Sequence, residues 1–204
     1  GASASDDPRG RRERSRDLLQ EARAALRLRH PHIVPVNDVG SVGDQFYISM
    51  KCIEGDTLAD HGFAAQSRGR VSPLYEDPAF YLGALRDVAD AIHYAHTFPA
   101  PIIHCDLKPA NILISVEGAA YILDFGLARA LNVPATEELE ARGTPCYMAP
   151  EQVVGRSSAL GVWTDVYGLG AILYELLAGQ PAFVGNSSEV MRTSFTLVSV
   201  PGTP

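Results

Sequence analysis

The residues best suited to chemistry lie close together, between positions 104 and 126. Asp106, Lys108 and Asn111 share one short stretch, and Asp124 follows Asn111 by thirteen residues. Phosphoryl transfer from a nucleotide needs a carboxylate that accepts the proton of the attacking hydroxyl, a cation beside the transferred phosphate, and oxygen ligands for divalent metal ions. Asp106 suits the first task and Lys108 the second. Asn111 and Asp124 suit the third, because Mg²⁺ prefers hard oxygen ligands.

Taken singly, each part of this pattern has a plainer interpretation. An aspartate five residues before an asparagine is more often a solvated turn than a metal site, and Asp-Phe-Gly at 124–126 can simply end a hairpin. The occurrence of both at this spacing favours the catalytic interpretation.

Apolar periodicity predicts the elements that would position these residues. The expected elements are helices at 15–29, 78–98 and 164–178, strands at 33–39 and 45–53, and a hairpin formed by 111–116 and 119–125. The helix at 164–178 is so apolar that burial in the centre of a domain is expected. Residues 61–78 contain Gly, Ser and Pro and are predicted to be a connection.

Six motifs in the same order carry a resemblance to a known family. They are His-Cys-Asp-Leu-Lys-Pro-Ala-Asn at 104–111, Asp-Phe-Gly at 124–126, Gly-Thr-Pro-Cys-Tyr-Met-Ala-Pro-Glu at 143–151, the start of a buried helix at 165–170, Gln-Glu-Ala at 20–22 before Pro-His-Ile-Val at 31–34, and the stretch at 47–55. Together they resemble the catalytic domain of eukaryotic-type (Hanks-type) protein kinases. The style of the run at 143–151 is most similar to bacterial Ser/Thr kinases.

The resemblance implies roles for individual residues. It makes Asp106 the catalytic base and Lys108 a contact of the γ-phosphate. It makes Asn111 and Asp124 the ligands of Mg²⁺, and Thr144 a brace of the catalytic loop. The implied cofactors are ATP and Mg²⁺, and the implied substrate is a Ser or Thr hydroxyl of a protein.

The resemblance also implies an adenine site. Met50 would be the gatekeeper residue behind the base, and backbone groups of Lys51 and Ile53 would hydrogen-bond its edge. Leu113 would pack beneath it. A regulatory spine of stacked side chains would be formed by Ala25, Val36, His104 and Phe125.

The implied fold is the α+β fold of protein kinases. Residues 1–15 are expected to be a disordered or frayed Arg-rich tail. Residues 16–53 would form an incomplete N-lobe, with one helix and two strands, and the hinge. Residues 54–204 would form a mostly helical C-lobe that lacks its last helices.

The sequence departs from the family pattern at several points. No glycine-rich loop precedes the first helix, and Lys51 and Lys108 are the only lysines, so the lysine that normally pairs with Glu21 has no counterpart. We expect truncation at both ends, and an unpaired Glu151 because its arginine partner would lie beyond the sequence. Cys105 replaces the usual arginine, which predicts that phosphorylation of the loop, with Thr136 as a weak candidate, is not required.

Two other functions compete with protein phosphorylation. A pseudokinase-like binding or scaffolding module is favoured by the missing lysine, whereas the intact set at 106–124 favours an enzyme. A phosphotransferase acting on small molecules is disfavoured by the peptide-docking pattern at 143–151.

Composition sets further limits. A net charge of −7 argues against nucleic acid or an anionic membrane as the main partner, and the arginines between positions 9 and 29 are better read as a solvated helix face and tail. No apolar run approaches the roughly 18–20 residues that span a bilayer. The three cysteines have no metal-ligand spacing, and reduced thiols in a cytoplasmic protein are expected.

Overall fold

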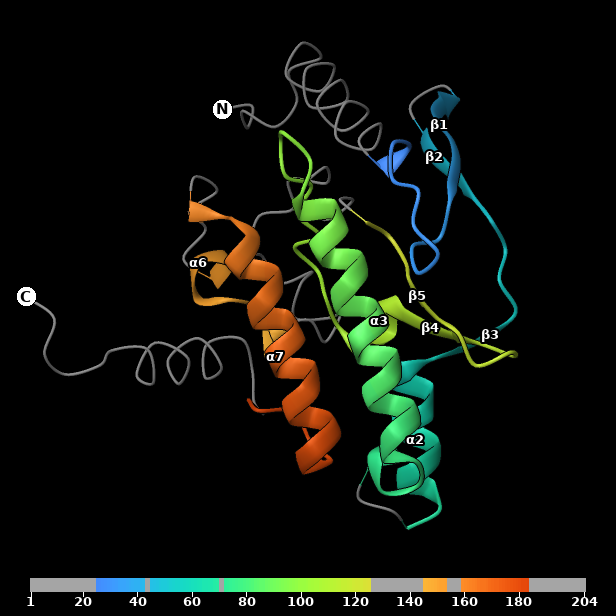
Figure 1. The fold of residues 1–204 in the computed structure, drawn as a ribbon, viewed down its shortest axis with the longest axis vertical. Helices are drawn as coiled ribbons and strands as arrows, with labels where there is room; N and C mark the ends of the chain where they lie inside the picture. Colours follow the sequence, from blue (N-terminus) through green and yellow to red (C-terminus); the bar gives the residue numbers. More distant parts are fainter. Residues whose placement is uncertain (1–24, 43–44, 70–71, 126–144, 154–158, 184–204) are drawn as a thin grey trace, which may run out of the picture.

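The described part of the protein is a set of helices packed beside two small sheets. The computed structural model describes residues 25–42, 45–69, 72–125, 145–153 and 159–183 (Figure 1). The predicted tail at 1–15 and most of the predicted helix at 15–29 lie outside the described residues.

The first sheet is the hairpin of β1 (Val36–Val42) and β2 (Gln45–Met50), which pair antiparallel. The predicted strands are thus present, but β1 begins later than expected. Pro35 has no N–H group to donate and therefore interrupts the strand. The residues before it turn to β5 instead: the Val34 N–H donates to Ile122 O at 3.0 Å, and the Ile122 N–H donates to His32 O at 2.8 Å.

The second sheet has the order β3-β4-β5, with both neighbouring pairs antiparallel. β4 (Ile112–Ser115) and β5 (Ala120–Ile122) form the predicted hairpin. β3 (Gly55–Thr57) was not predicted, because three residues without apolar alternation carry no strand signal. Gly55 is required here, since a Cβ atom at this position would lie 2.1 Å from Ile114 O.

The prediction of a connection at 61–78 is wrong over its first part, where α2 (Leu58–Ser67) forms. The sequence carries a start signal for this helix. The Asp60 N–H donates to Thr57 Oγ1 at 3.2 Å, and the Thr57 N–H donates to Asp60 Oδ2 at 3.0 Å, which is a reciprocal cap. The absence of a clear apolar stripe between Leu58 and Ser67 hid the helix.

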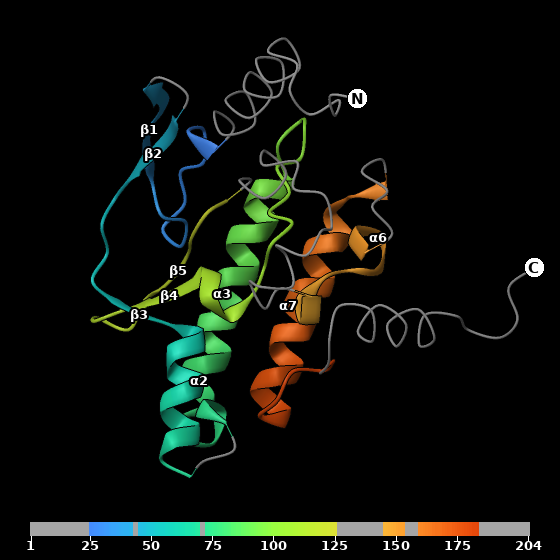
Figure 2. The ribbon, with the colours of Figure 1, turned by 180° about the vertical axis from the view of Figure 1, so that it is seen from behind.

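Two long helices form the centre of the described fold. α3 (Pro78–His96) and α7 (Val162–Ala178) confirm the two predicted helices and run side by side in opposite directions (Figures 1 and 2). α3 is capped by Asp77, whose carboxylate accepts the Phe80 N–H at 3.0 Å, and α7 is followed by the cap residue Gly179, which has a left-handed φ of 71°.

The main core lies between α3, the second sheet and one face of α7. Its largest fully buried side chains include Leu28, Val88, His104, Ile112, Ile122 and Ile172. The expected burial of α7 in the centre of a domain holds for one face only, since Trp163, Val166, Tyr174 and Leu177 are 47–60% exposed. α7 buries one face against α3 and the site loop, while these four side chains lie on its other face. None of the helices in the described part of the chain has the length and apolarity needed to cross a membrane.

Candidate active site

The carboxylate of Asp106 is held between two other predicted site residues. Lys108 Nζ lies 2.7 Å from Asp106 Oδ2, and Asn111 Nδ2 donates to the same oxygen at 3.0 Å. Asn111 Nδ2 also donates to Asp106 O at 2.8 Å. The side chains of Asp106 and Lys108 are 24% and 16% exposed, so the group is partly shielded from water. A carboxylate, an ammonium and an amide therefore meet at one point.

A tight turn creates this arrangement. Pro109 begins a 3₁₀ turn at 109–111, in which the Asn111 N–H donates to Lys108 O at 2.9 Å. Proline fits the first position of a helical turn, because no partner is needed there for its missing N–H. The turn folds Asn111 back toward Asp106 and passes directly into β4, which fixes Asn111 on the sheet.

Asp124 reaches the same region from β5. The Leu123 N–H donates to Asn111 O at 2.9 Å, so the residue before Asp124 is hydrogen-bonded to a predicted metal ligand. Asp124 is exposed and has a left-handed φ of 54°. The hairpin thus brings the backbone at Asp124 beside the turn that carries Asn111.

A buried carboxylate from α7 anchors the loop that carries Asp106. Asp165 is 1% exposed and accepts from His104 N at 2.9 Å, Cys105 N at 2.8 Å and His96 Nε2 at 2.8 Å. Three donors compensate the desolvation of the charge. The sequence pattern places Asp165 at the start of a helix and predicts no role for this side chain. The signal that could have found it is an acidic residue in the first turn of a mostly apolar helix.

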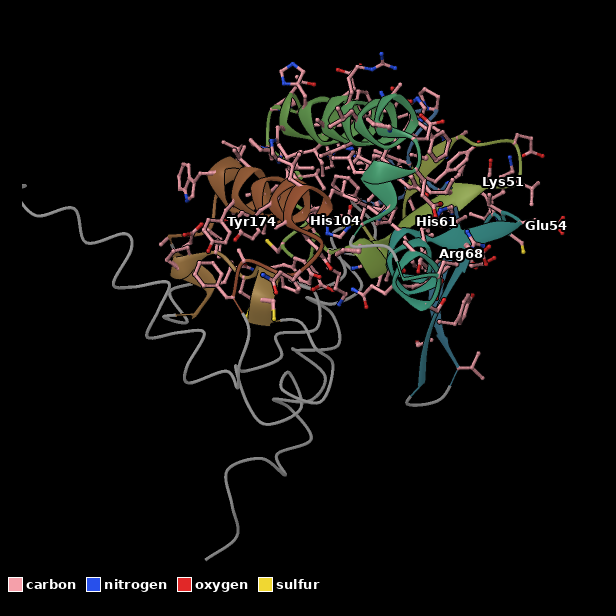
Figure 3. The ribbon with its side chains drawn as sticks, turned by 90° about the horizontal axis from the view of Figure 1, so that it is seen from below. Lys51, Glu54, His61, Arg68, His104 and Tyr174 are labelled. Atoms are coloured by element: carbon pink, nitrogen blue, oxygen red, sulfur yellow. The ribbon has the colours of Figure 1, made fainter. Side chains whose placement is uncertain are left out.

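His104 connects the loop to the second sheet and to Phe125. Its Nε2 lies 2.9 Å from Leu123 O, and its Nδ1 lies 3.2 Å from the Asp106 nitrogen. A carbonyl accepts and an N–H donates, so both contacts are satisfied by the neutral tautomer with the proton on Nε2. Figure 3 shows His104 among the interior side chains, whereas Lys51 and Glu54 lie at the edge.

The proposed spine residues are all buried. The rings of His104 and Phe125 meet edge to face with 5.0 Å between centroids. Ala25 is 3% exposed and Val36 is 8% exposed. The structure thus shows the contact at one end of the proposed stack and the burial of its other members.

The residues predicted around adenine lie where the two sheets are linked. Met50 ends β2, and Leu113 lies in β4 with 9% of its surface exposed. Lys51 is exposed, and its N–H donates to Pro35 O at 2.9 Å. Ile53 is half-buried just before β3, which pairs with β4.

The segment at 145–153 packs against α7. Tyr147 OH donates to Glu175 Oε2 at 2.6 Å, and burial raises the pKa of both groups. Glu151, which was expected to lack its arginine partner, accepts a hydrogen bond from Thr164 Oγ1 at 2.7 Å. This neutral donor comes from α7. Thr144 and Thr136 lie outside the described residues.

Histidine, cysteine and acidic side chains do not gather in groups of three that could hold a metal ion, as far as the structure describes the chain. The ligands predicted for Mg²⁺ are one amide and one carboxylate, and therefore do not form a group of three such side chains. Asn111 uses its nitrogen toward Asp106, so its amide oxygen is the atom suited to a cation.

Asp106, Lys108 and Asn111 thus lie on one loop that leads into the β4-β5 hairpin and is anchored on α7 by Asp165. In a comparison with known families, residues 5–200 match the protein kinase domain. The chain belongs to the protein kinase domain family.

Bacterial Ser/Thr kinases are among its relatives. The chain is 37% identical over 174 residues to serine/threonine-protein kinase PknB of Mycobacterium leprae, covering 82% of this chain and 26% of that protein. It is 38% identical over 175 residues to PknE of Mycobacterium tuberculosis (strain H37Rv), covering 85% of this chain and 29% of that protein. The chain therefore spans less than a third of the length of these relatives.

A solved structure supports the fold. The crystal structure of a mutant of the Mycobacterium tuberculosis PknI kinase domain superposes with a TM-score of 0.64 at 28% identity. The match covers 87% of this chain and 63% of the other. The α+β fold of protein kinases is thereby confirmed.

Proposed function

We propose that this protein transfers the γ-phosphate of ATP to Ser or Thr hydroxyl groups of a protein substrate. The observation that carries the proposal is the Asp106 carboxylate, which is held by Lys108 Nζ at 2.7 Å and by Asn111 Nδ2 at 3.0 Å. Both contacts use the same oxygen, Oδ2, so the other oxygen of the carboxylate can take the proton of a hydroxyl nucleophile.

Each site residue has a role in this proposal. Asp106 orients the substrate hydroxyl and accepts its proton, and Lys108 offers its ammonium to the transferred phosphate. Asn111 and Asp124 would hold Mg²⁺, which supplies charge neutralisation at the phosphates when bound. Thr144 would brace the catalytic loop.

The nucleotide would be held at the link between the two sheets. We assign Met50, the Lys51 carbonyl, the Ile53 N–H and the side chain of Leu113 to the adenine base. Leu113 offers an apolar surface, and backbone groups offer the donor and acceptor that the base edge needs. We further propose that residues 16–53 act as N-lobe and hinge and residues 54–204 as C-lobe.

The cytoplasm is the proposed place of this reaction, because ATP is available there. Cys52, Cys105 and Cys146 are free of disulfide bonds, which suits a reducing compartment.

A chimera tests the proposed function. The glycine-rich loop and lysine-bearing strand of a bacterial relative are joined before Gly1, and phosphate transfer from ATP to a basic protein is measured with Mg²⁺. We expect transfer that disappears in the Asp106→Asn form of the same chimera. If the folded chimera binds ATP yet transfers no more than this variant, the binding-module alternative replaces the enzyme.

A further inference from the structure

One side chain of α6 (Pro150–Val153) reaches the catalytic loop. Gln152 Nε2 donates to Cys105 O at 2.6 Å. We propose that Gln152 is a positioning residue, which sets the orientation of Asp106 by holding the peptide group before it. The proposed effect on catalysis rests on the proposed function of Asp106. The contact between Gln152 and Cys105 does not.

The peptide group between Cys105 and Asp106 is held on both sides. Its carbonyl oxygen accepts from Gln152, and its N–H donates to His104 Nδ1 at 3.2 Å. Because a peptide group is planar, these two bonds fix its rotation about the chain. Rotation of this plane changes ψ of Cys105 and φ of Asp106, the torsions that set the direction in which the Asp106 side chain leaves the backbone.

The backbone at Cys105 needs such support. Its φ is 63°, in the left-handed region that residues with a side chain rarely adopt. A strained conformation persists where surrounding groups hold it. Asp165 Oδ1 holds the N–H of Cys105 at 2.8 Å, and Gln152 holds its carbonyl. The two bonds lie on the two peptide groups that flank the strained residue.

The amide of Gln152 has a defined orientation. Its oxygen accepts the Ala149 N–H at 3.0 Å, and Ala149 is fully buried. The nitrogen is therefore the end that faces Cys105 O. A primary amide has an acceptor at one end and a donor at the other at every pH, so it satisfies both contacts. Gln152 thereby links the segment at 145–153 to the catalytic loop.

Replacing this amide with a carboxyl tests the proposal. Gln152→Glu keeps an acceptor for Ala149 but donates to Cys105 O only when the carboxyl is protonated. The matched control is Gln66→Glu, which makes the same change at an exposed position of α2. Gln152→Met, which lacks a donor at any pH, is the second variant.

The first readout needs no enzymatic activity. Cys-Asp occurs once in the sequence, at 105–106, so carbonyl-¹³C cysteine with ¹⁵N aspartate gives one correlated NMR signal. We expect the Cys105 carbonyl shift to move in Gln152→Glu near neutral pH and to return toward the unsubstituted value as the introduced carboxyl is protonated. Gln152→Met should show the altered Cys105 carbonyl chemical shift at every pH. Each spectrum is compared with the unsubstituted chain at the same pH, because His104, Glu151 and Asp165 are common to both.

The second readout is phosphate transfer by the chimera described above. We expect kcat of Gln152→Glu to be roughly tenfold below that of the unsubstituted chimera near neutral pH, because about one hydrogen bond is lost. This difference should become smaller as pH falls. The KM for ATP should change less, because Gln152 acts on Asp106 and not on the nucleotide.

Three results would overturn the proposal. The first is a change in the Cys105 carbonyl chemical shift that is no larger in Gln152→Glu than in Gln66→Glu. The second is a change in Gln152→Glu that does not reverse with pH, while Gln152→Met behaves like the unsubstituted chain. The third is a changed chemical shift with an unchanged kcat in an active chimera. A chimera that is inactive without any substitution, but shows the reversible shift, contradicts the proposed function alone.

Discussion

His96 Nε2 donates to Asp165 Oδ2 at 2.8 Å and thereby joins the end of α3 to the first turn of α7 across 69 positions of sequence. The same oxygen accepts the His104 N–H at 2.9 Å. One buried carboxylate thus ties two core helices to the catalytic loop, so the geometry of the loop depends on the packing of the helices.

Asp165→Asn should destabilise the protein by about 3 kcal/mol. The amide offers one acceptor atom where the carboxylate offers two, so its NH₂ group would face either the Cys105 N–H or the donors of His104 and His96. Urea unfolding followed by circular dichroism measures the change. Asp90→Asn, on the exposed side of α3, is the control. An equal effect of both substitutions would contradict the anchoring role.

The pair of Tyr147 and Glu175 predicts a pH dependence of stability. Burial raises the pKa of Glu175 above its ordinary 4.5, so the folded state holds this proton more tightly than the unfolded state. The stabilising contribution is therefore present below pH 4.5 and is lost as pH rises through the folded pKa.

Glu175→Gln removes this titration while keeping an oxygen that accepts from Tyr147. We expect the variant to gain stability relative to the unsubstituted protein as pH rises above 4.5. Urea unfolding over a pH series checks this, with Glu117→Gln in the exposed turn as control. A constant difference between variant and parent at all pH values would disprove it.

Gly55→Ala should lower the free energy of unfolding by about 1–3 kcal/mol. The added Cβ would lie 2.1 Å from Ile114 O, so β3 would have to leave β4 or shift its register. Gly62→Ala is a matched control, because no atom lies within 4 Å of its Cβ position. As a helix-interior change it should stabilise by about 0.5–1 kcal/mol. Thermal unfolding of both variants shows whether each substitution stabilises or destabilises the protein.

Residues 1–204 alone should transfer little or no phosphate despite the ordered group around Asp106. Phosphoryl transfer depends on positioning and charge stabilisation by groups that act as a unit, and this sequence has no lysine besides Lys51 and Lys108. The rate of transfer to a basic protein is compared with that of Asp106→Asn. Transfer well above this background would mean that another cation, first of all an N-terminal arginine, replaces the missing lysine.

The sequence predicted those features that local patterns encode. The helices at 78–96 and 162–178 have clear periodicity, and the β4-β5 hairpin is marked by Glu117-Gly118. The spacing of Asp106 and Asn111 predicted their approach, because a short turn joins them.

Features that depend on remote contacts were not predicted. The role of Asp165 arises from donors about 60 residues earlier, and the contact of Gln152 with Cys105 spans 47 residues. The pairing of Glu151 with Thr164 is also a tertiary contact, 13 residues apart. Neither periodicity nor residue type shows which such groups meet.

The two hydrogen bonds that join Ile122 to His32 and Val34 have a mechanical consequence for the β1-β2 hairpin. The hairpin is joined to the rest of the fold covalently through residues 51–54, and a second time through His32 and Val34, which both hydrogen-bond Ile122. A body attached at two separate points can turn about the line through them without breaking either attachment, whereas sliding or lifting breaks one. Displacement of the hairpin by sliding or lifting would therefore cost the hydrogen bonds that join His32 and Val34 to Ile122.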